Sequence, residues 1–96
     1  WAEFLQKMAA TNEGERSLLD NSMILLTSSL MDGNAHDSKQ LPVVLAGGGG
    51  GTIKGGQAYD LSNDPNRKLC RLHLALMDRM GVQVGKFGDA ENALAI

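Results

Sequence analysis

The chain has 96 residues, of which 43% are hydrophobic and 21% are charged, and its formal net charge at pH 7 is -2. This composition excludes collagen-like, coiled-coil and strongly disordered classes. The pI near 5.5 gives no basic footprint for nucleic acid, and no apolar run reaches the roughly 18–20 residues of a membrane span. Cys70 is the single cysteine, which excludes an internal disulfide framework and a cysteine-based zinc cluster.

Glycine and aromatic content bear on how much core the chain can build. Aromatic residues make up 4% of the chain, and ten of its 12 glycines lie within residues 47–56 and 81–88. Glycines add no side chain to a core, and a domain of this size buries only a modest fraction of its surface. We therefore expect residues 1–96 to be a single segment of a larger domain. A complete small domain is the alternative.

The first expected elements are a helix and a buried strand. Trp1, Phe4, Leu5 and Met8 recur at helical spacing and predict an amphipathic helix. Residues 22–30 form an apolar run without charge or alternation, which favours a strand buried on both faces, as in a parallel sheet. A buried helix is the alternative for this run, because methionine and leucine outnumber its β-branched residues.

A second strand and a second helix follow. Residues 41–46 predict a short buried strand that starts at a proline. Farther on, Asp64 as N-cap, Pro65 at the first helical position and Gly81 as C-cap bound a predicted helix. The apolar stripe of this helix consists of Leu69, Leu72, Leu76 and Met80. The order of elements predicts an α/β fold with a partial, mostly parallel sheet and flanking helices.

The loop between the two predicted strands is the first candidate site. It contains Asp32, Asn34, His36 and Asp37, with Gly33 to bend the backbone. In open α/β sheets, ligands bind beyond the carboxyl ends of the strands, and carboxylate plus imidazole is a donor set for zinc, manganese or iron. The alternative is an ordinary turn, for which Asp-Gly-Asn is well suited.

The glycine run after the second strand is the other candidate. Backbone N–H groups of Gly48, Gly49, Gly50 and Gly51 could cradle an anion. The run matches neither the Walker pattern nor Gly-x-Gly-x-x-Gly, and a structural loop packed against a neighbouring strand is the alternative. In that case several of these glycines should have positive φ or approach another backbone too closely for a Cβ.

Several stretches of the chain resemble one bacterial family. They are residues 18–25, 32–37 (Asp-Gly-Asn-Ala-His-Asp), 41–52 (Leu-Pro-Val-Val-Leu-Ala, five glycines, Thr), 74–82 and 87–89. Together they resemble the C-terminal part of the HXXSHH-motif family, a domain of unknown function in secreted bacterial proteins several times this length. The HXXSHH motif itself is not in the sequence. The family in turn is similar to the alkaline-phosphatase and sulfatase superfamily, whose metallohydrolases carry Asp and His ligands after parallel strands.

The resemblance implies a fold, a function and a location. It implies the C-terminal part of an alkaline-phosphatase/sulfatase-like domain in a secreted or periplasmic protein. The full protein would be a metal-dependent hydrolase of phosphate or sulfate esters, with Asp32 and His36 binding a divalent metal (zinc, manganese or calcium) and Asn34 and Asp37 supporting these ligands. A non-catalytic surface or binding protein that keeps the fold without metals is the alternative. The expected partner is the remainder of the parent chain or another copy of this one.

Overall fold

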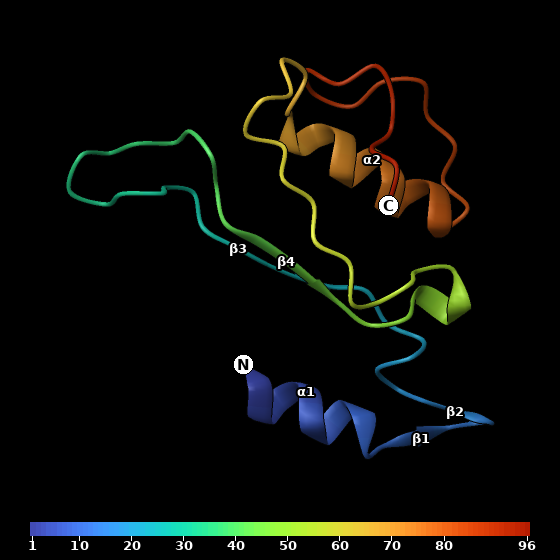
Figure 1. Ribbon diagram of the computed structural model, residues 1–96. Helices are drawn as coiled ribbons and strands as arrows, with labels where there is room; N and C mark the ends of the chain where they lie inside the picture. The colour runs from blue at the N-terminus through green and yellow to red at the C-terminus, as the bar shows by residue number, and fades with distance from the viewer. The chain divides into compact units, whose positions relative to one another are not determined.

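The computed structural model describes residues 1–96 and has mixed α and β structure (Figure 1). The chain divides into two compact units, unit 1 (Trp1–Gly55) and unit 2 (Gly56–Ile96). Unit 1 contains helix α1 (Ala2–Ala9), strands β1 (Asn12–Glu13), β2 (Arg16–Ser17), β3 (Ile24–Thr27) and β4 (Val43–Ala46), and the 3₁₀ helix η1 (Gly49–Gly51). Unit 2 contains helix α2 (Leu69–Arg79).

The predicted N-terminal helix is confirmed as α1. Of its apolar stripe, Leu5 and Met8 are half-buried, whereas Trp1 and Phe4 are 45% and 51% exposed. The chain then turns at Gly14, which has φ +65°, and β1 and β2 form a short antiparallel pair on either side of it. The stripe of α1 is thus only partly covered in this unit.

Strands β3 and β4 form a two-stranded antiparallel sheet, with Leu25 opposite Leu45 and Leu26 opposite Val44. The expectation of parallel strands is wrong for this pair. A parallel connection needs a crossover, usually a helix, whereas residues 28–42 contain no helix and fold back on themselves as a long hairpin loop (Figure 1). The strands are also not buried on both faces, because Leu26, Val43 and Val44 are exposed.

Helix α2 confirms the second predicted helix but starts later than expected. Its N-cap is Lys68, not Asp64. Asp64 instead closes a turn of its own, where its Oδ1 accepts the N–H of Asn66 (2.7 Å) and its carbonyl accepts the N–H of Arg67 (3.2 Å). At the other end, Gly81 has φ +78°, which is the left-handed conformation typical of the residue after a helix.

Unit 2 holds the fully buried apolar residues, which are Leu72, Leu74, Ala75 and Ala90. Ala90 comes from a turn after α2 in which Phe87 and Ala90 exchange backbone hydrogen bonds of 3.0 and 2.9 Å. Met80, expected in the helix stripe, is 69% exposed because it lies at the C-terminal cap. None of the helices has both the length and the apolar character needed to span a membrane.

The Leu74 side chain, 3% exposed, is predicted to hold unit 2 together. Leu74→Ala should lower the free energy of unfolding of this unit by about 2–5 kcal/mol, since it leaves a cavity as well as losing buried area. Met80→Ala, at the exposed end of α2, should change it by about 0.5 kcal/mol or less. Native-state hydrogen exchange of the α2 amides measures both. Equal losses for the two variants would contradict this assignment of the core.

Candidate functional site

The Asp32–Asp37 loop is a closed turn within the β3–β4 hairpin loop. The carboxylate Oδ1 of Asp32 accepts the backbone N–H groups of Asn34 (2.8 Å) and Ala35 (3.0 Å). The N–H of Asp37 donates to the Asp32 carbonyl (3.0 Å), and the N–H of Met31 donates to the Asp37 carbonyl (2.6 Å). The structure therefore brings Asp32 and Asp37 together through their backbones.

These hydrogen bonds also affect the titration of the Asp32 carboxyl. The N–H of Ala35 and, after it, that of Asn34 hold the pKa of the Asp32 carboxyl below its usual value, against a small opposing effect of desolvation. Amide donors aimed at a carboxylate stabilise its charged form. Asp32, which is ionised at neutral pH like other exposed aspartates, therefore stays ionised to a lower pH than they do. Its second oxygen, Oδ2, accepts no hydrogen bond within the chain.

His36 occupies the unusual backbone position of the turn. Its φ is +52°, in the left-handed region that residues with a Cβ seldom adopt, and its side chain is exposed. Gly33, expected to supply the bend, has no positive φ. Asp37 is half-buried, and its Oδ1 accepts the N–H of Lys39 (2.8 Å).

The carboxylates and the imidazole of this turn amount to less than a complete metal site. The structure assembles no group of three or more His, Cys, Asp or Glu side chains suited to a metal ion. Catalytic zinc sites take three protein ligands. Asp32 and His36 would therefore need at least one ligand from outside the chain.

The glycine run turns the chain directly after β4. Gly47, Gly49, Gly50 and Gly51 have φ of +102°, +53°, +68° and +94°, which confirms the prediction of positive φ in this run. A Cβ on Gly47 would lie 2.1 Å from the Ser22 carbonyl oxygen, far inside van der Waals contact. The run thus requires glycine both for its dihedral angles and for close backbone approach.

The N–H groups of the run bind the chain itself. Those of Gly48, Gly49, Gly50 and Gly51 donate, in this order, to the carbonyl oxygens of Leu19 (3.2 Å), Ser22 (3.0 Å), Asp20 (2.9 Å) and Gly48 (2.8 Å). In this conformation none of the four is directed at an anion. In the structure the run is a turn that holds the chain after β4 against residues 19–22, and we call it the docking turn. Anion binding by these N–H groups stays a prediction.

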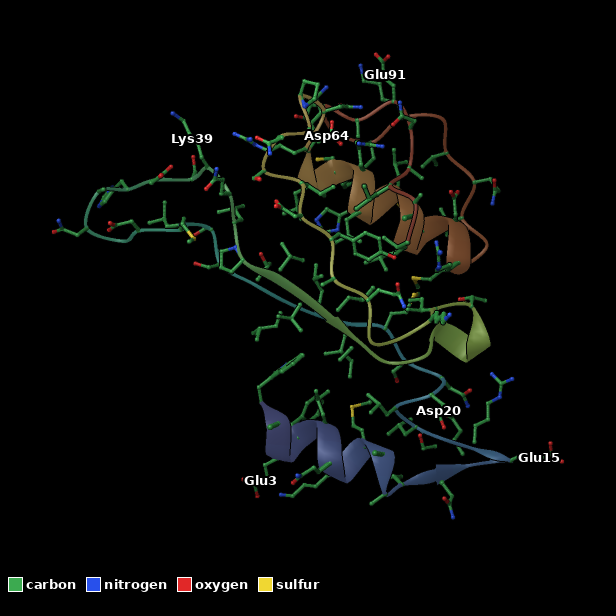
Figure 2. All side chains as sticks on the ribbon, in the orientation of Figure 1. Glu3, Glu15, Asp20, Lys39, Asp64 and Glu91 are labelled. Atoms are coloured by element: carbon green, nitrogen blue, oxygen red, sulfur yellow. The ribbon has the colours of Figure 1, made fainter.

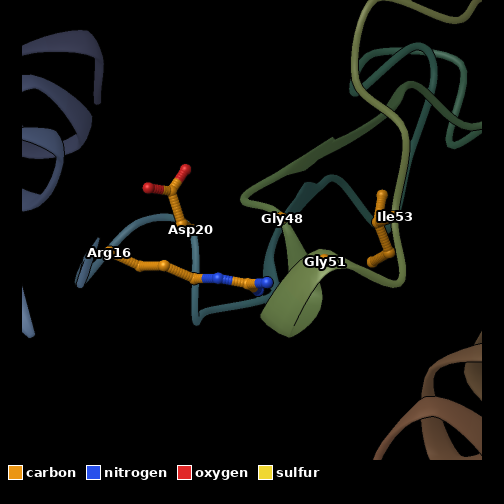
Figure 3. A pocket seen from close by; sticks show the side chains of 5 residues that line it. All are labelled: Arg16, Asp20, Gly48, Gly51 and Ile53. Carbon is orange, nitrogen blue, oxygen red and sulfur yellow. The ribbon is translucent and has the colours of Figure 1, made fainter. Parts of the chain in front are cut away.

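Beside this turn lies an open hollow of about 290 Å³ lined by Arg16, Asp20, Gly48, Gly51 and Ile53 (Figure 3). The Arg16 side chain reaches from β2 to Gly51, while the Asp20 carboxylate points away from the guanidinium (Figure 3). A Cβ on Gly51 would lie 2.9 Å from Arg16 Nη1, so glycine makes room for this arginine. The hollow therefore carries one charge of each sign and favours no particular ligand.

Sequence reasoning missed the hydrogen bonds between Ser17 and Asp20, which fix the Asp20 side chain beside this hollow. The Ser17 N–H (3.0 Å) and hydroxyl (2.8 Å) donate to Asp20 Oδ2, and the Asp20 N–H donates to Ser17 Oγ (3.1 Å). The Ser17 N–H above all, then its hydroxyl, and less strongly Arg16, lower the pKa of Asp20. The Ser-x-x-Asp spacing is a sequence signal for such reciprocal bonding.

Comparison of the chain with protein-family models, with curated proteins and with solved structures finds no match.

Alanine substitutions are predicted to separate the two roles of glycine in the run. Gly50→Ala, where nothing lies near the added Cβ but φ is +68°, should lower the free energy of unfolding by about 1–2 kcal/mol. Gly47→Ala should lower it by more, because it adds a backbone clash to the same strain. Gly33→Ala, with neither feature, is the control and should change little. Urea unfolding followed by circular dichroism gives the three free energies of unfolding. Equal losses of stability in Gly33→Ala and Gly47→Ala would contradict the role of the run as a docking turn.

The Asp32 turn is predicted to loosen in acid. Because the folded pKa of Asp32 lies below its unfolded value, the carboxylate stabilises the turn above about pH 4. That stabilisation is lost as the pH falls through the lowered folded pKa. The amide resonances of Asn34 and Ala35, followed by NMR, should shift with a midpoint below 3.8. Asp32→Asn keeps an acceptor oxygen and should abolish this titration; its persistence in the variant would assign it to another group.

Proposed function

We propose that the chain is the C-terminal part of an alkaline-phosphatase/sulfatase-like domain and that its Asp32–Asp37 turn serves a metal-dependent hydrolase of phosphate or sulfate esters. The observation that carries this proposal is the Asp32 carboxylate. Two backbone N–H groups fix its Oδ1, while its Oδ2 has no partner in the chain. A carboxylate oriented in this way is prepared to bind a cation.

The neighbouring side chains supply the rest of what this chain offers a metal. His36 adds an imidazole four residues after Asp32, on a left-handed backbone (φ +52°) that Gln40 of the same loop also has (φ +54°). Carboxylate with imidazole suits zinc or manganese, and carboxylate oxygens suit calcium. When bound, such a metal polarises an ester oxygen or activates a water molecule.

Asn34 and Asp37 would support these two ligands. The N–H of Asn34 holds Asp32 Oδ1, and the backbone of Asp37 closes the turn against Asp32. The Asp37 carboxylate has one oxygen on the Lys39 N–H, which leaves the other to hydrogen-bond a ligand. Partners of this kind fix the orientation of metal ligands and raise their affinity. The remaining ligands and the nucleophile would come from other parts of the domain.

The larger domain would also supply the mostly parallel sheet that the resemblance implies. Sheets of that kind often carry an antiparallel strand at an edge, and the β3–β4 pair would be such an addition. The same resemblance places the full protein outside the cytoplasm, in the periplasm or the secreted fraction. The exposed Leu26, Val43 and Val44 are consistent with a segment whose apolar surface is covered by further chain.

The second candidate is a non-catalytic surface or binding protein that keeps the fold without metals. It is favoured by what Asp32 and Asp37 already do, because each uses one carboxylate oxygen to close the loop. Aspartate is common in turns for this reason alone. In that case His36 would be an exposed loop residue with no ligand.

Metal analysis of the full-length protein is the test that distinguishes these functions. Purified protein incubated with zinc or manganese and passed through a desalting column should retain the metal. Asp32→Asn and His36→Ala should each weaken its binding by about tenfold or more, and hydrolysis of p-nitrophenyl phosphate or sulfate should fall in parallel. Inductively coupled plasma mass spectrometry measures the metal content.

Asp60→Asn is the matched control for this test. Asp60 Oδ1 also accepts a backbone N–H, from Ser62 at 2.9 Å, and its pKa is also lowered, but no histidine follows it in its turn. This variant should keep full metal content. Unchanged metal content in His36→Ala would contradict the assignment of the metal site to this turn. A wild-type protein with neither bound metal nor hydrolase activity would favour the non-catalytic alternative.

A further inference from the structure

Several aspartates of the chain form the same short turn, in which Oδ1 accepts the backbone N–H of the residue two positions later. They are Asp32, Asp37, Asp60 and Asp64. Of these, only Asp32 has a second backbone N–H on the same oxygen, that of Ala35 at 3.0 Å. Asp32 is also the only one that is followed by glycine, because the residues after the others are Ser38, Leu61 and Pro65. The Asp32 turn therefore differs from the other three in two ways.

The first difference, Gly33, leaves a backbone nitrogen open beside the Asp32 carboxyl. Both residues are exposed, and the N–H of Gly33 donates no hydrogen bond within the chain. No atom lies within 4 Å of the place that a Cβ on Gly33 would take. The nitrogen that follows an aspartate can close a succinimide ring on Cγ. A Cβ on the following residue hinders that approach, and glycine has none.

The second difference, the pair of N–H groups on Asp32 Oδ1, favours attack at Cγ. When a nitrogen adds to the carboxyl carbon, negative charge develops on the oxygen that stays bound. Backbone N–H groups already directed at that oxygen stabilise the charge, as in the oxyanion hole of a hydrolase. Here the N–H groups of Asn34 (2.8 Å) and Ala35 (3.0 Å) point at Oδ1. Oδ2 accepts no hydrogen bond within the chain, so nothing holds it as the leaving oxygen.

We propose that Asp32 and Gly33 form a self-modification site, at which the turn promotes conversion of Asp32 to isoaspartate. The bond from the Gly33 nitrogen to Asp32 Cγ forms and the bond from Cγ to Oδ2 breaks. Oδ2 leaves as water, with the amide proton of Gly33 and one proton from the solvent. Water then adds to the α-carbonyl of the ring and breaks its bond to the Gly33 nitrogen. The main chain afterwards runs through Cγ, and the former α-carbonyl is a free carboxylate.

This modification opens the turn. It turns Oδ1 into a main-chain carbonyl oxygen and adds a methylene carbon to the main chain between Asp32 and Gly33. The backbone hydrogen bond from the Asp37 N–H to the Asp32 carbonyl (3.0 Å) is then lost, because that carbonyl has become a side group. The exposed loop thus carries a change that accumulates with the age of the protein. The step needs only water and is independent of the proposed metal function.

The test is the isoaspartate content of the chain after incubation for weeks at neutral pH with a metal chelator. Peptide mapping with electron-transfer dissociation distinguishes isoaspartate from aspartate at each position. Asp32 should contain about tenfold or more isoaspartate than Asp60, whose Oδ1 accepts a single backbone N–H and which leucine follows. In the Gly33→Ala variant, whose added Cβ meets no other atom, the content at Asp32 should fall to the level at Asp60.

A second incubation, of the wild-type chain unfolded in guanidinium chloride, separates the effect of the turn from that of the sequence. Unfolding removes both N–H groups from Oδ1 but keeps glycine after Asp32, so isoaspartate should form about tenfold more slowly. Three results would overturn the proposal. They are no isoaspartate at Asp32, equal amounts in the Gly33→Ala variant, and faster formation in the unfolded chain, which would mean that the turn protects Asp32. Because the chelator is present throughout, these results stay separate from the test of metal binding.

Discussion

Unit 1 depends on the close approach of the glycine run to residues 19–22. Three successive N–H groups, of Gly48, Gly49 and Gly50, donate to carbonyls in that segment, and Gly47 passes so near Ser22 that no side chain fits between them. These contacts end β4 at Ala46 and join it to the chain before β3. The antiparallel register of the two strands follows from this anchor, because it fixes the end at which Ile24 lies opposite Ala46. The loop at the other end of the hairpin is thus supported by backbone contacts.

The elements that could be predicted are those with a local cause. The stripe of α1, the left-handed Gly81 after α2 and the positive φ of the glycine run all follow from side-chain spacing or from the special conformational range of glycine. The pairing direction of β3 and β4 could not be predicted, because an uncharged apolar run fits a buried parallel strand and an exposed hairpin strand equally well. The start of α2 also could not be predicted, because Asp64 fits a helix N-cap and a separate turn equally well. Its side-chain Oδ1 does accept a backbone N–H, but that of Asn66 in a separate turn, and Arg71 Nη1 donates to its Oδ2 at 3.3 Å.

In the candidate site, the predicted metal site and its alternative, an ordinary turn, involve the same residues. The sequence predicts Asp32 as a metal ligand and Asp37 as its support, or both as turn formers, and the hydrogen bonds show that they form the turn. Turn formation uses one oxygen of each carboxylate, which leaves the other for the predicted role, so the two roles are compatible. The left-handed His36 could not be predicted from the sequence, since Gly33 was the obvious residue to bend the loop. Arg16 and Asp20, which line the separate hollow beside the glycine run, are joined to that run only by tertiary contact.

The distribution of apolar side chains explains why the two units need different support (Figure 2). In unit 2, Leu72, Leu74 and Ala75 of α2 are buried, as is Ala90 of the segment after the helix, so burial itself holds the unit. In unit 1 no side chain is fully buried, and its order comes from backbone hydrogen bonds in turns and in two short sheets. Such bonds contribute only about 0.5–1.5 kcal/mol each beyond what water offers the same groups. A unit built in this way is stabilised by whatever covers the exposed Leu26, Val43 and Val44 of its two longer strands.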